Sequence, residues 1–297
     1  MRIRPFEYHT AANLEDALAQ LAEYGPEGKV LAGGTDLILA MKHKKVIPNH
    51  VISIRKVGEL AFVKEEANRL RIGALATHSQ LCSNELVREE AISLWEAISL
   101  IGSWQIRNIA TIGGNLCNAS PAADSAPPLL TLDARVVIAD AKGEREIPLE
   151  SFFTGPGATV LGQDQLLKEI VIDTPRSLSR GCYLKLMRKK AVDLSVVGVA
   201  FQAEVYESRK TLSRVAIGLG GVAPTPIRAH RAEAILNELE YHEALKALPD
   251  AARAAVEETS PITDIRASAE YRKAVVDAYV RRAGEKVLNA LFQEGGE

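Results

Sequence analysis

The chain has 297 residues, of which 47% are hydrophobic and 25% are charged, and its formal net charge is −2. A chain of this length can support two or three subdomains with well-formed cores. The near-neutral balance gives no electrostatic reason to expect nucleic acid or a membrane surface as a partner. No apolar run approaches the roughly 20 residues of a spanning helix, and the N-terminus lacks a signal peptide's apolar stretch. We therefore expect a cytoplasmic protein.

The first 56 residues predict a parallel α/β unit. FEYHT (6–10), KVLAGG (29–34) and VISI (51–54) have the character of strands. Between them, LEDALAQLAEY (14–24) predicts a helix capped by Asn13 and ended by Gly25, and DLILAMKHKK (36–45) predicts a second helix. The alternation of strand and helix is typical of a parallel sheet, with the glycines at the C-terminal end of a strand. The basic run at 42–45 is interpreted as a solvated helix end.

The pattern changes near residue 60. FVKEE (62–66) and RLRIGAL (69–75) predict a hairpin, after which Thr77 can cap a helix. ISLWEAISLIGS (92–103) has the apolar spacing of a helix. LLTLDARVVIAD (129–140) and REIPL (145–149) are interpreted as strands, and FFTGPGAT (152–159) as a loop.

Pro175 and the polar segment RSLSRG (176–181) indicate a boundary between domains. Beyond it, YLKLMRK (183–189), SVVGVAFQAEVY (195–206) and RVAIGLGGV (214–222) predict three strands of an antiparallel sheet. The GLGG within the last of these is interpreted as a structural turn. Helices are expected from Arg231 to Phe292. The whole chain is thus expected to be α+β.

Metal chemistry is not predicted. The three cysteines, Cys82, Cys117 and Cys182, lie far apart and form no CxxC motif, which predicts neither a zinc site nor an iron–sulfur cluster. The six histidines show no HxxxH or HxH spacing. We interpret them as surface residues.

Two short loops share two adjacent glycines. We name AGGTD (32–36) the first head and TIGGN (111–115) the second head. A backbone N–H reaches a phosphate oxygen most easily where no Cβ blocks it, and consecutive glycines allow the positive φ angles that turn several N–H groups toward one anion. One such loop more often marks a plain turn. Two of them, both expected at strand ends, fit a ligand with two linked phosphates, although neither contains GxGxxG or GK[ST].

Four stretches carry a family resemblance: AGGTDL (32–37), QIRNIATIGGNLCNASPAAD (105–124), FFTGPG (152–157) and YLKLMRKKAVDLSVVGVA (183–200). Together they resemble the FAD-binding medium subunit of molybdenum hydroxylases, a family with xanthine, carbon monoxide and nicotinate dehydrogenases and aryl-CoA reductases. The resemblance implies an FAD-binding domain of the vanillyl-alcohol-oxidase-like (PCMH) type in two α/β subdomains, residues 1–56 and 57–176. A C-terminal flavoprotein domain, with a three-stranded antiparallel sheet and helices, would occupy residues 177–297.

The resemblance also implies a set of cofactor-binding residues. The FAD pyrophosphate would be bound by Ala32, Gly33, Gly34, Thr35 and Asp36 of the first head, and by Thr111, Ile112, Gly113, Gly114 and Asn115 of the second. The flanking residues Leu31, Leu37 and Ala110 are implied to be cofactor-binding as well. Further contacts are implied for Asp124 with cofactor hydroxyls, for Lys185 near the flavin ring, and for Ile101 and Ile170 beside the cofactor.

Several of these residues also have a purely structural interpretation. Asp36 can be a helix N-cap even if its loop binds FAD, and Asp124 can cap a following turn. Lys185, taken alone, is expected to be a solvent-facing strand residue. Arg107 can bridge to phosphate or hold its own loop through carbonyl groups, and we favour loop support.

Two further features allow more than one interpretation from the sequence. Arg188 and Asp193 can form a pair that fixes their connection or a solvated pair. Cys117 lies inside the second head's loop with no general base near it in the sequence, so we interpret it as a small neutral filler.

The implied function is electron transfer within a larger enzyme. A large subunit would hold the molybdenum cofactor and a small one two [2Fe–2S] clusters, from which electrons would pass through FAD on this chain to NAD⁺ or a quinone. No catalytic residue is expected here, and three dispersed cysteines cannot hold the [4Fe–4S] cluster of some aryl-CoA reductase relatives. The alternatives are a stand-alone oxidase of the vanillyl-alcohol-oxidase type, disfavoured because no histidine lies close to either head in the sequence, or a flavin-binding scaffold.

Overall fold

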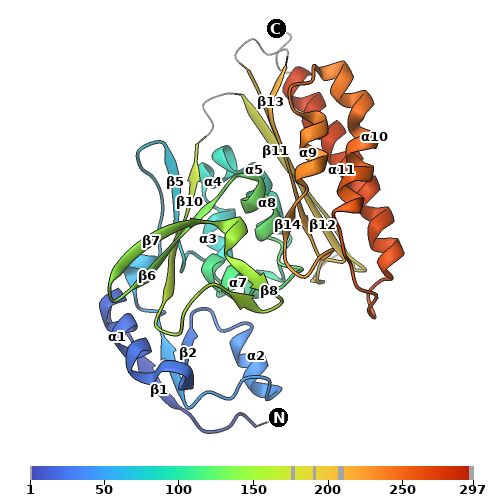
Figure 1. Ribbon diagram of the computed structural model, residues 1–297. Helices are drawn as coiled ribbons and strands as arrows, with labels where there is room; N and C mark the ends of the chain where they lie inside the picture. Colours follow the sequence, from blue (N-terminus) through green and yellow to red (C-terminus); the bar gives the residue numbers. More distant parts are fainter. Residues whose placement is uncertain (1, 175–177, 190–191, 207–210, 294–297) are drawn as a thin grey trace.

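The computed structural model describes residues 2–174, 178–189, 192–206 and 211–293, and Figure 1 shows its three bodies in chain order. A three-stranded sheet (β1-β3-β2) is followed by a five-stranded sheet (β4-β5-β10-β6-β7) and a four-stranded sheet (β11-β12-β13-β14). Of the predicted boundary, residues 175–177 lie outside the described residues. The division at residues 56 and 176 stays a prediction.

The first sheet is parallel and is covered by a helix on each face. It consists of β1 (Glu7–Thr10), β3 (His50–Ser53) and β2 (Gly28–Leu31), with α1 (Leu14–Tyr24), η1 (Gly25–Glu27) and α2 (Leu37–Lys42) between them. Ile52 packs with the residues of α1, whereas its neighbour Val51 packs with Met41 of α2, as alternation along a strand requires. The Oδ1 of Asn13 accepts the N–H of Asp16 at 2.8 Å. The predicted parallel unit and its first helix cap are confirmed.

The five-stranded sheet is antiparallel, and short helices cover it. Its strands are β4 (Val63–Glu65), β5 (Arg69–Gly73), β10 (Leu166–Asp173), β6 (Arg135–Asp140) and β7 (Gly143–Pro148). The helices are η2 (Gly58–Leu60), α3 (His78–Cys82), α4 (Glu85–Glu90), α5 (Ile92–Ser99), α6 (Trp104–Arg107), α7 (Ile112–Cys117), α8 (Ala126–Thr131) and η3 (Leu149–Ser151). Thr77 caps α3 in a full capping box with Gln80, as predicted for its position.

Some expectations for this body are wrong. Residues 129–131 end helix α8 rather than forming a strand, because Pro127 and Pro128 favour the first turn of a helix. The second head does not follow a strand; it lies between α6 and α7 and supplies the first turn of α7. The predicted loop 152–159 contains a small hairpin, β8 (Phe153–Gly155) and β9 (Ala158–Thr159).

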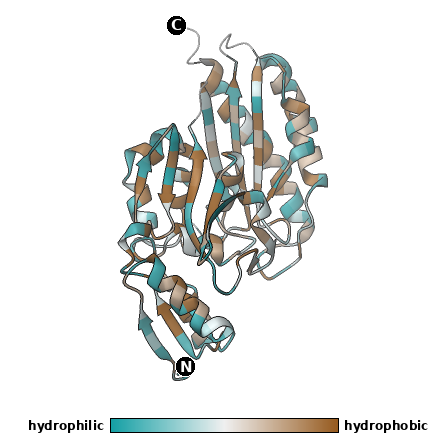
Figure 2. Cartoon of the chain, turned by 60° about the vertical axis from the view of Figure 1, so that its left-hand side comes forward, coloured by the Kyte–Doolittle hydropathy of each residue, from teal (hydrophilic) through white to brown (hydrophobic). Residues whose placement is uncertain are grey.

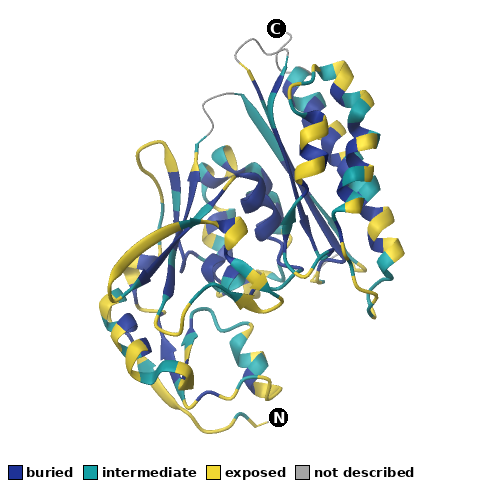
Figure 3. Ribbon diagram, in the orientation of Figure 1, coloured by how far each residue is buried: buried dark blue, intermediate teal, exposed yellow. Residues whose placement is uncertain are grey.

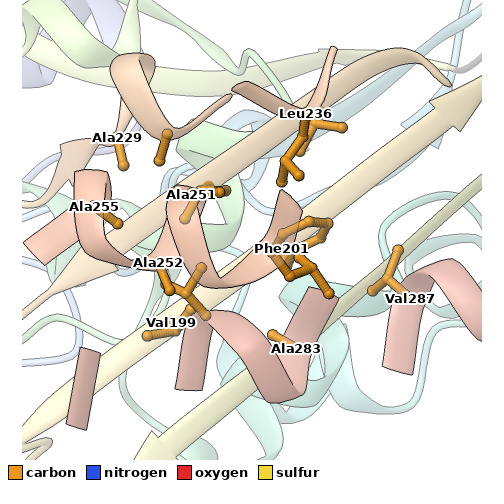
Figure 4. Packing of buried hydrophobic residues seen from close by; sticks show 14 of the residues in the cluster. Val199, Phe201, Ala229, Leu236, Ala251, Ala252, Ala255, Ala283 and Val287 are labelled. Carbon is orange, nitrogen blue, oxygen red and sulfur yellow. The ribbon is translucent and has the colours of Figure 1, made fainter. Parts of the chain in front are cut away.

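The C-terminal sheet is antiparallel and buried on both faces. It consists of β11 (Ser179–Leu186), β12 (Val197–Val205), β13 (Leu212–Gly220) and a two-residue fourth strand, β14 (Ile227–Arg228), beyond the three that were predicted. Helices α9 (His230–Leu236), α10 (Tyr241–Glu257) and α11 (Ala269–Gln293) cover one face, and α5 and α8 cover the other. Phe201 lies in one buried cluster with Ala252 and Ala283 (Figure 4), whereas its neighbour Ala200 packs with Ala97 of α5.

This double cover explains the apolar sequence of β12. Nearly all of its residues are buried, as the dark blue strands in Figure 3 show. In Figure 2 the strands of this region carry many hydrophobic, brown residues, interrupted by single hydrophilic, teal ones. A strand buried on both faces loses the polar alternation of a half-exposed strand. Among the described residues, no helix combines the length and apolar character needed to cross a bilayer.

Candidate cofactor site

The two heads lie side by side. A Cβ on Gly33 would stand only 2.3 Å from the carbonyl oxygen of Ile109 and 2.9 Å from the Cα of Ala110, and one on Gly114 would stand 4.0 Å from the Cβ of Ala32. The main chains can approach this closely only because Gly33 has no side chain. The convergence predicted from the two glycine pairs is confirmed.

The first head is open and presents free donors. Residues 32–35 are partly exposed and Asp36 is exposed. Among the described residues, no protein acceptor bonds the N–H groups of residues 32–36. Gly34 has a φ of 82°, and a turn of this kind arranges successive N–H groups around a concavity that suits an anion. Asp36 stands at the N-cap position of α2, but its side chain makes no capping hydrogen bond.

The second head is closed. Its N–H groups donate within the protein: Ile112 to Ala76 O (3.0 Å), Gly113 to Ala74 O (2.9 Å), Gly114 to Thr111 Oγ1 (3.1 Å) and Asn115 to Thr111 O (3.0 Å). Only Gly114 and Asn115 are partly exposed, whereas residues 110–113 are buried. The expectation that this loop turns the N–H groups of residues 112–115 toward a phosphate is therefore wrong. What it presents is the bare Cα of Gly114 and the amide of Asn115, whose Oδ1 accepts from Ser125 Oγ at 2.6 Å and leaves the NH₂ group to donate.

Sequence reasoning missed a cation beside the first head. The Nη2 of Arg55 lies 3.4 Å from the carbonyl oxygen of Gly33, and the residue is exposed. Arg55 follows β3, whose C-terminal end lies at the same edge of the parallel sheet as the end of β2. Ligands bind at that edge in open parallel sheets, so a basic residue directly after the third strand is a signal that could have identified it.

Two cations hold the segment that precedes the second head. Lys185 Nζ donates to Leu100 O at 3.0 Å, and Arg107 Nη1 donates to Ile101 O at 2.7 Å and to Gly102 O at 3.2 Å. These carbonyl groups follow the last turn of α5, where backbone acceptors lack helical partners. The predicted loop support by Arg107 is confirmed.

Asp124, at the tail of the second head, is the centre of a buried polar cluster. Its Oδ1 accepts from Tyr183 Oη (2.7 Å) and Ser195 Oγ (2.5 Å), and its Oδ2 accepts from Lys185 Nζ (2.8 Å). The side chains of Lys185 and Asp124 are 1% and 8% exposed. The solvent-facing interpretation of Lys185 is therefore wrong, as is the N-cap interpretation of Asp124, because Ser125 occupies the N-cap of α8. The cluster joins the part of the chain that contains the second head and the five-stranded sheet to the C-terminal sheet.

The charge of Asp124 also acts on its neighbour. Burial, together with the carboxylate of Asp124, raises the pKa of Tyr183 well above its usual value. The phenol therefore stays protonated and donates.

Ile101 and Ile170 differ in what they can reach. Ile101 is partly exposed and packs at the edge of the core. Ile170 has 0% exposed surface in the middle of β10, paired with Ile72 and Val136 on either side. A residue without accessible surface cannot contact a cofactor, so the implied role of Ile170 is not supported and we leave it out of the site.

A histidine does lie at the second head in space. The N–H of His78 donates to Ala110 O at 3.0 Å. Its ring is fully buried, and neither ring nitrogen has a hydrogen-bond partner among the described residues. Burial, with the charge of Arg107, lowers the pKa of His78 to about 4. A neutral ring without accessible surface offers neither a base to a substrate nor a tether to a flavin.

The structure also decides between the two interpretations of the Arg188–Asp193 pair and agrees with the interpretation of Cys117. Asp193 accepts the N–H groups of Arg188 at 2.9 Å and of Leu194 at 3.0 Å, and its Oδ2 lies 3.7 Å from Arg188 Nε, so this pair fixes its connection. Burial raises the pKa of the Cys117 thiol to about 12, which agrees with a neutral filler.

The donors at the joined heads fit a diphosphate. The joined heads offer a run of free N–H groups in residues 32–36, the exposed guanidinium of Arg55 beside Gly33, and the amide of Asn115 next to Gly114. No carboxylate other than exposed Asp36 belongs to either head. The N–H, guanidinium and amide groups are those that bind phosphate oxygens in proteins.

Comparison with known proteins gives the family. Residues 4–175 match the FAD-binding domain in molybdopterin dehydrogenase, and residues 182–287 match the CO dehydrogenase flavoprotein C-terminal domain. The chain is 33% identical to the xanthine dehydrogenase FAD-binding subunit of Escherichia coli O157:H7, over 98% of this chain and 97% of that protein. It is also 33% identical to the carbon monoxide dehydrogenase medium chain of Hydrogenophaga pseudoflava, over 97% of each.

Solved structures agree. A chain of carbon monoxide dehydrogenase from Hydrogenophaga pseudoflava superposes with a TM-score of 0.92 at 32% identity, covering 98% of this chain and 99% of that one. A chain of quinoline 2-oxidoreductase from Pseudomonas putida 86 gives a TM-score of 0.89 at 25% identity, covering 98% and 100%. The protein therefore belongs to the family of FAD-binding flavoprotein subunits of molybdopterin dehydrogenases, which are oxidoreductases.

Proposed function

We propose that this chain is the electron-transfer subunit of a multi-subunit molybdenum hydroxylase, holding the FAD through which electrons pass between the [2Fe–2S] clusters of a partner and an external acceptor. The observation that carries the proposal is the open run of N–H groups in residues 32–36, placed against Gly114 in a chain of this family. The relatives named as a medium chain and as an FAD-binding subunit support a place within a complex.

The binding roles follow from which groups are free. We propose that the N–H groups of the first head hold the diphosphate, that Arg55 offsets its charge, and that Asn115 donates its amide from the opposite side. The bare Cα of Gly114 leaves room for phosphate. Leu31 and Leu37 stabilise the first head by packing, because both belong to the small hydrophobic core that includes Met41 and Val51.

Asp124 and Lys185 keep a limited capacity for the cofactor. A carboxylate offers about four acceptor positions and an ammonium has three donors. Three protein donors use Asp124, and two acceptors use Lys185. We propose that one position on each remains for a cofactor hydroxyl or for the flavin ring, and that the main role of the pair is to hold the second head against the C-terminal sheet.

The remaining centres belong on partner chains. FAD, when bound, supplies a group that can exchange electrons one or two at a time. A [2Fe–2S] cluster takes four protein ligands, and this sequence has three cysteines in all. A molybdopterin-binding large subunit and a [2Fe–2S] small subunit are therefore the proposed partners, with NAD⁺ or a quinone as the external acceptor.

An apolar surface next to the second head supports docking of a partner. Four side chains between residues 100 and 109 are exposed: Leu100 (37%), Trp104 (70%), Ile106 (39%) and Ile109 (44%). Large apolar side chains gathered in one exposed segment are typical of a surface that a partner covers.

The test is anaerobic reaction of the full chain loaded with FAD. The loaded chain is reduced with dithionite and mixed with NAD⁺, a water-soluble quinone or oxygen, and in a second series it is mixed with small oxidisable substrates. An electron-transfer subunit is reoxidised by an acceptor and turns over no substrate by itself. Turnover of a substrate by the chain alone would favour the stand-alone oxidase, and a chain that exchanges electrons with neither donor nor acceptor would be a scaffold.

A further inference from the structure

Three side chains with metal-binding atoms meet at the first sheet, far along the chain from one another. Glu7 and His9 lie on β1, and His50 begins β3 in parallel register with Glu7. Residues i and i+2 of a strand share a face, and so do registered neighbours, so all three side chains lie on one face of the sheet. Spacing in the sequence gives no sign of this group, because the register of two strands creates it.

The ligand atoms are separated by distances that a bound transition ion would require. His9 Nε2 and His50 Nδ1 are 3.1 Å apart, and the Oε2 of Glu7 lies 3.5 Å from His50 Nδ1 and 3.9 Å from His9 Nε2. A tetrahedral zinc ion with bonds of about 2.0–2.1 Å keeps its ligand atoms roughly 3.3 Å apart. The three separations bracket this value.

The imidazole rings are held in place by a third ring. Tyr24, at the end of α1, stacks on His9 with ring centres 4.4 Å apart and on His50 with ring centres 4.2 Å apart. The side chains of the two histidines are 22% and 20% exposed, whereas that of Glu7 is 73% exposed. The two nitrogen ligands are thus fixed by packing, and the carboxylate side is open to water.

We propose that Glu7, His9 and His50 form a binding site for a divalent transition ion of the zinc type, completed by water. Two imidazoles and one carboxylate select zinc and its neighbours in the first transition row over magnesium and calcium, which prefer oxygen ligands alone. A bound ion ties β1, an edge strand of four residues, to the central strand β3.

This site is separate from the proposed FAD site. Glu7 and His50 begin their strands, whereas the first head follows the last residue of β2, so the two sites lie at opposite ends of the sheet (Figure 1). Zinc binding should therefore be the same with and without FAD. A failed test of FAD binding or electron transfer would leave the zinc site untouched, and a failed zinc test would leave the proposed function untouched.

The test is a titration of the full chain with zinc chloride. After removal of metal with a chelator, the chain competes for Zn²⁺ with a chromophoric zinc indicator, and one ion per chain is expected. His9→Gln and His50→Gln should each weaken binding at least about tenfold, since removing even an outer partner of a ligand costs that much. Glu7→Gln, at an exposed position that carries little risk to folding, should weaken it as well.

His230→Gln is the matched control. His230 also contacts two carboxylates, Glu150 at 2.7 Å and Glu233 at 3.2 Å, but through opposite ring nitrogens that cannot share one ion. This variant should bind zinc as the wild type does, and Zn²⁺ should raise the melting temperature of both but not that of His50→Gln. The proposal is overturned if the wild-type chain binds no zinc, or if the Glu7, His9 and His50 variants bind it as tightly as the wild type.

Discussion

The two heads share a pair of glycines but use them for different physical reasons. In the first head, Gly34 adopts a positive φ and the neighbouring N–H groups have no acceptor within the described protein. In the second head, Gly113 is buried, and a Cβ there would lie 2.5 Å from the Cβ of Ala74. In each pair one glycine permits close packing, Gly33 against Ile109 and Gly113 against Ala74. The heads differ in their backbone donors, which are free in the first and already bonded within the protein in the second. This difference supports the proposal that the first head supplies most of the contacts to the cofactor and that the second head mainly provides the packed surface beside it.

The segments that come after the two heads differ in the same way. The tail of the second head ends in the buried Asp124–Lys185 pair, which attaches it to β11 of the C-terminal sheet. The first head leads into α2, whose N-cap side chain makes no capping bond. Substitutions around the second head should therefore cost stability first, and substitutions in the first head should cost FAD affinity first.

The largest expected loss of stability comes from Lys185→Met. This substitution leaves the carboxylate of Asp124 buried without its cation, and breaking a buried ion pair in this way costs about 3–5 kcal/mol. The free energy of unfolding from urea titration, measured without FAD, should fall by this amount.

Lys168→Met serves as the control for that loss. Lys168 pairs with Glu144 at 2.5 Å, but both side chains are solvated, at 23% and 45% exposed. Its loss should stay within about 1 kcal/mol. Equal losses for the two variants would show that the Asp124–Lys185 pair does not hold the second head.

The second-largest effect separates the two glycines of the second head. Gly113→Ala forces a methyl group against Ala74 and should lower the free energy of unfolding by about 1–3 kcal/mol, the usual cost of overpacking. The new Cβ of Gly114→Ala comes close only to the hydroxyl of Thr111, at 2.9 Å, and makes an ordinary contact with Ala32 at 4.0 Å, so the substitution should cost no more than a helix cap, about 1 kcal/mol. FAD affinity of the folded protein should fall in Gly114→Ala alone. The opposite pattern would mean that Gly113 faces the ligand.

Sequence reasoning succeeded where local signals agree and failed where partners are distant. Helix α1 was predicted to the residue, because its apolar spacing, Asn13 and Gly25 all indicate the same limits. The helical end at residues 129–131 was mistaken for a strand, because a short apolar run fits either structure. Strand β10, the centre of the five-stranded sheet, was not identified at all.

The cofactor site could be predicted only in part, because some of its features have local signals and others depend on distant partners. Glycine pairs are visible in a sequence, and their convergence could be predicted from the need for two phosphate contacts. Which N–H groups are already bonded depends on Ala74 and Ala76, and nothing local indicates those partners. The ion pair of Lys185 with Asp124 and the group of Glu7, His9 and His50 likewise depend on tertiary pairing.

A pH titration tests the burial of His78 behind the second head. The pKa of His78 is about 4 in the folded chain against 6.5 for the free side chain, so the unfolded state binds a proton more readily. Its contribution to stability is present above pH 6.5 and is lost as the pH falls toward 4. Between pH 7 and pH 5 this one group should lower the free energy of unfolding by about 2 kcal/mol.

His78→Leu removes that contribution together with the two ring nitrogens that lack partners. Urea titrations at pH 7, 6 and 5 should show a flatter pH dependence in the variant than in the wild type, whatever its stability at pH 7. Parallel curves for the two proteins would mean that His78 is accessible to protons in the folded state. The segment around the second head would then be more open to solvent than its small exposed surface area indicates.

The smallest effect on stability should accompany a clear effect on binding. Gly34→Ala places a side chain at a φ of 82°, and Gly25→Ala does so at 49°, in open space beyond helix α1 and away from both heads. Each should cost about 1–2 kcal/mol of unfolding free energy, because residues with a Cβ disfavour positive φ angles. The new Cβ of Gly34→Ala also lies 2.8 Å from the Cδ1 of Leu31, whose side chain must shift. Only Gly34→Ala should weaken FAD binding, by about fivefold, which corresponds to one hydrogen bond of about 1 kcal/mol. Fluorescence titration with FAD measures this difference. If both variants bind FAD alike, the backbone of the first head is not what holds the diphosphate, and the division of roles between the two heads is wrong.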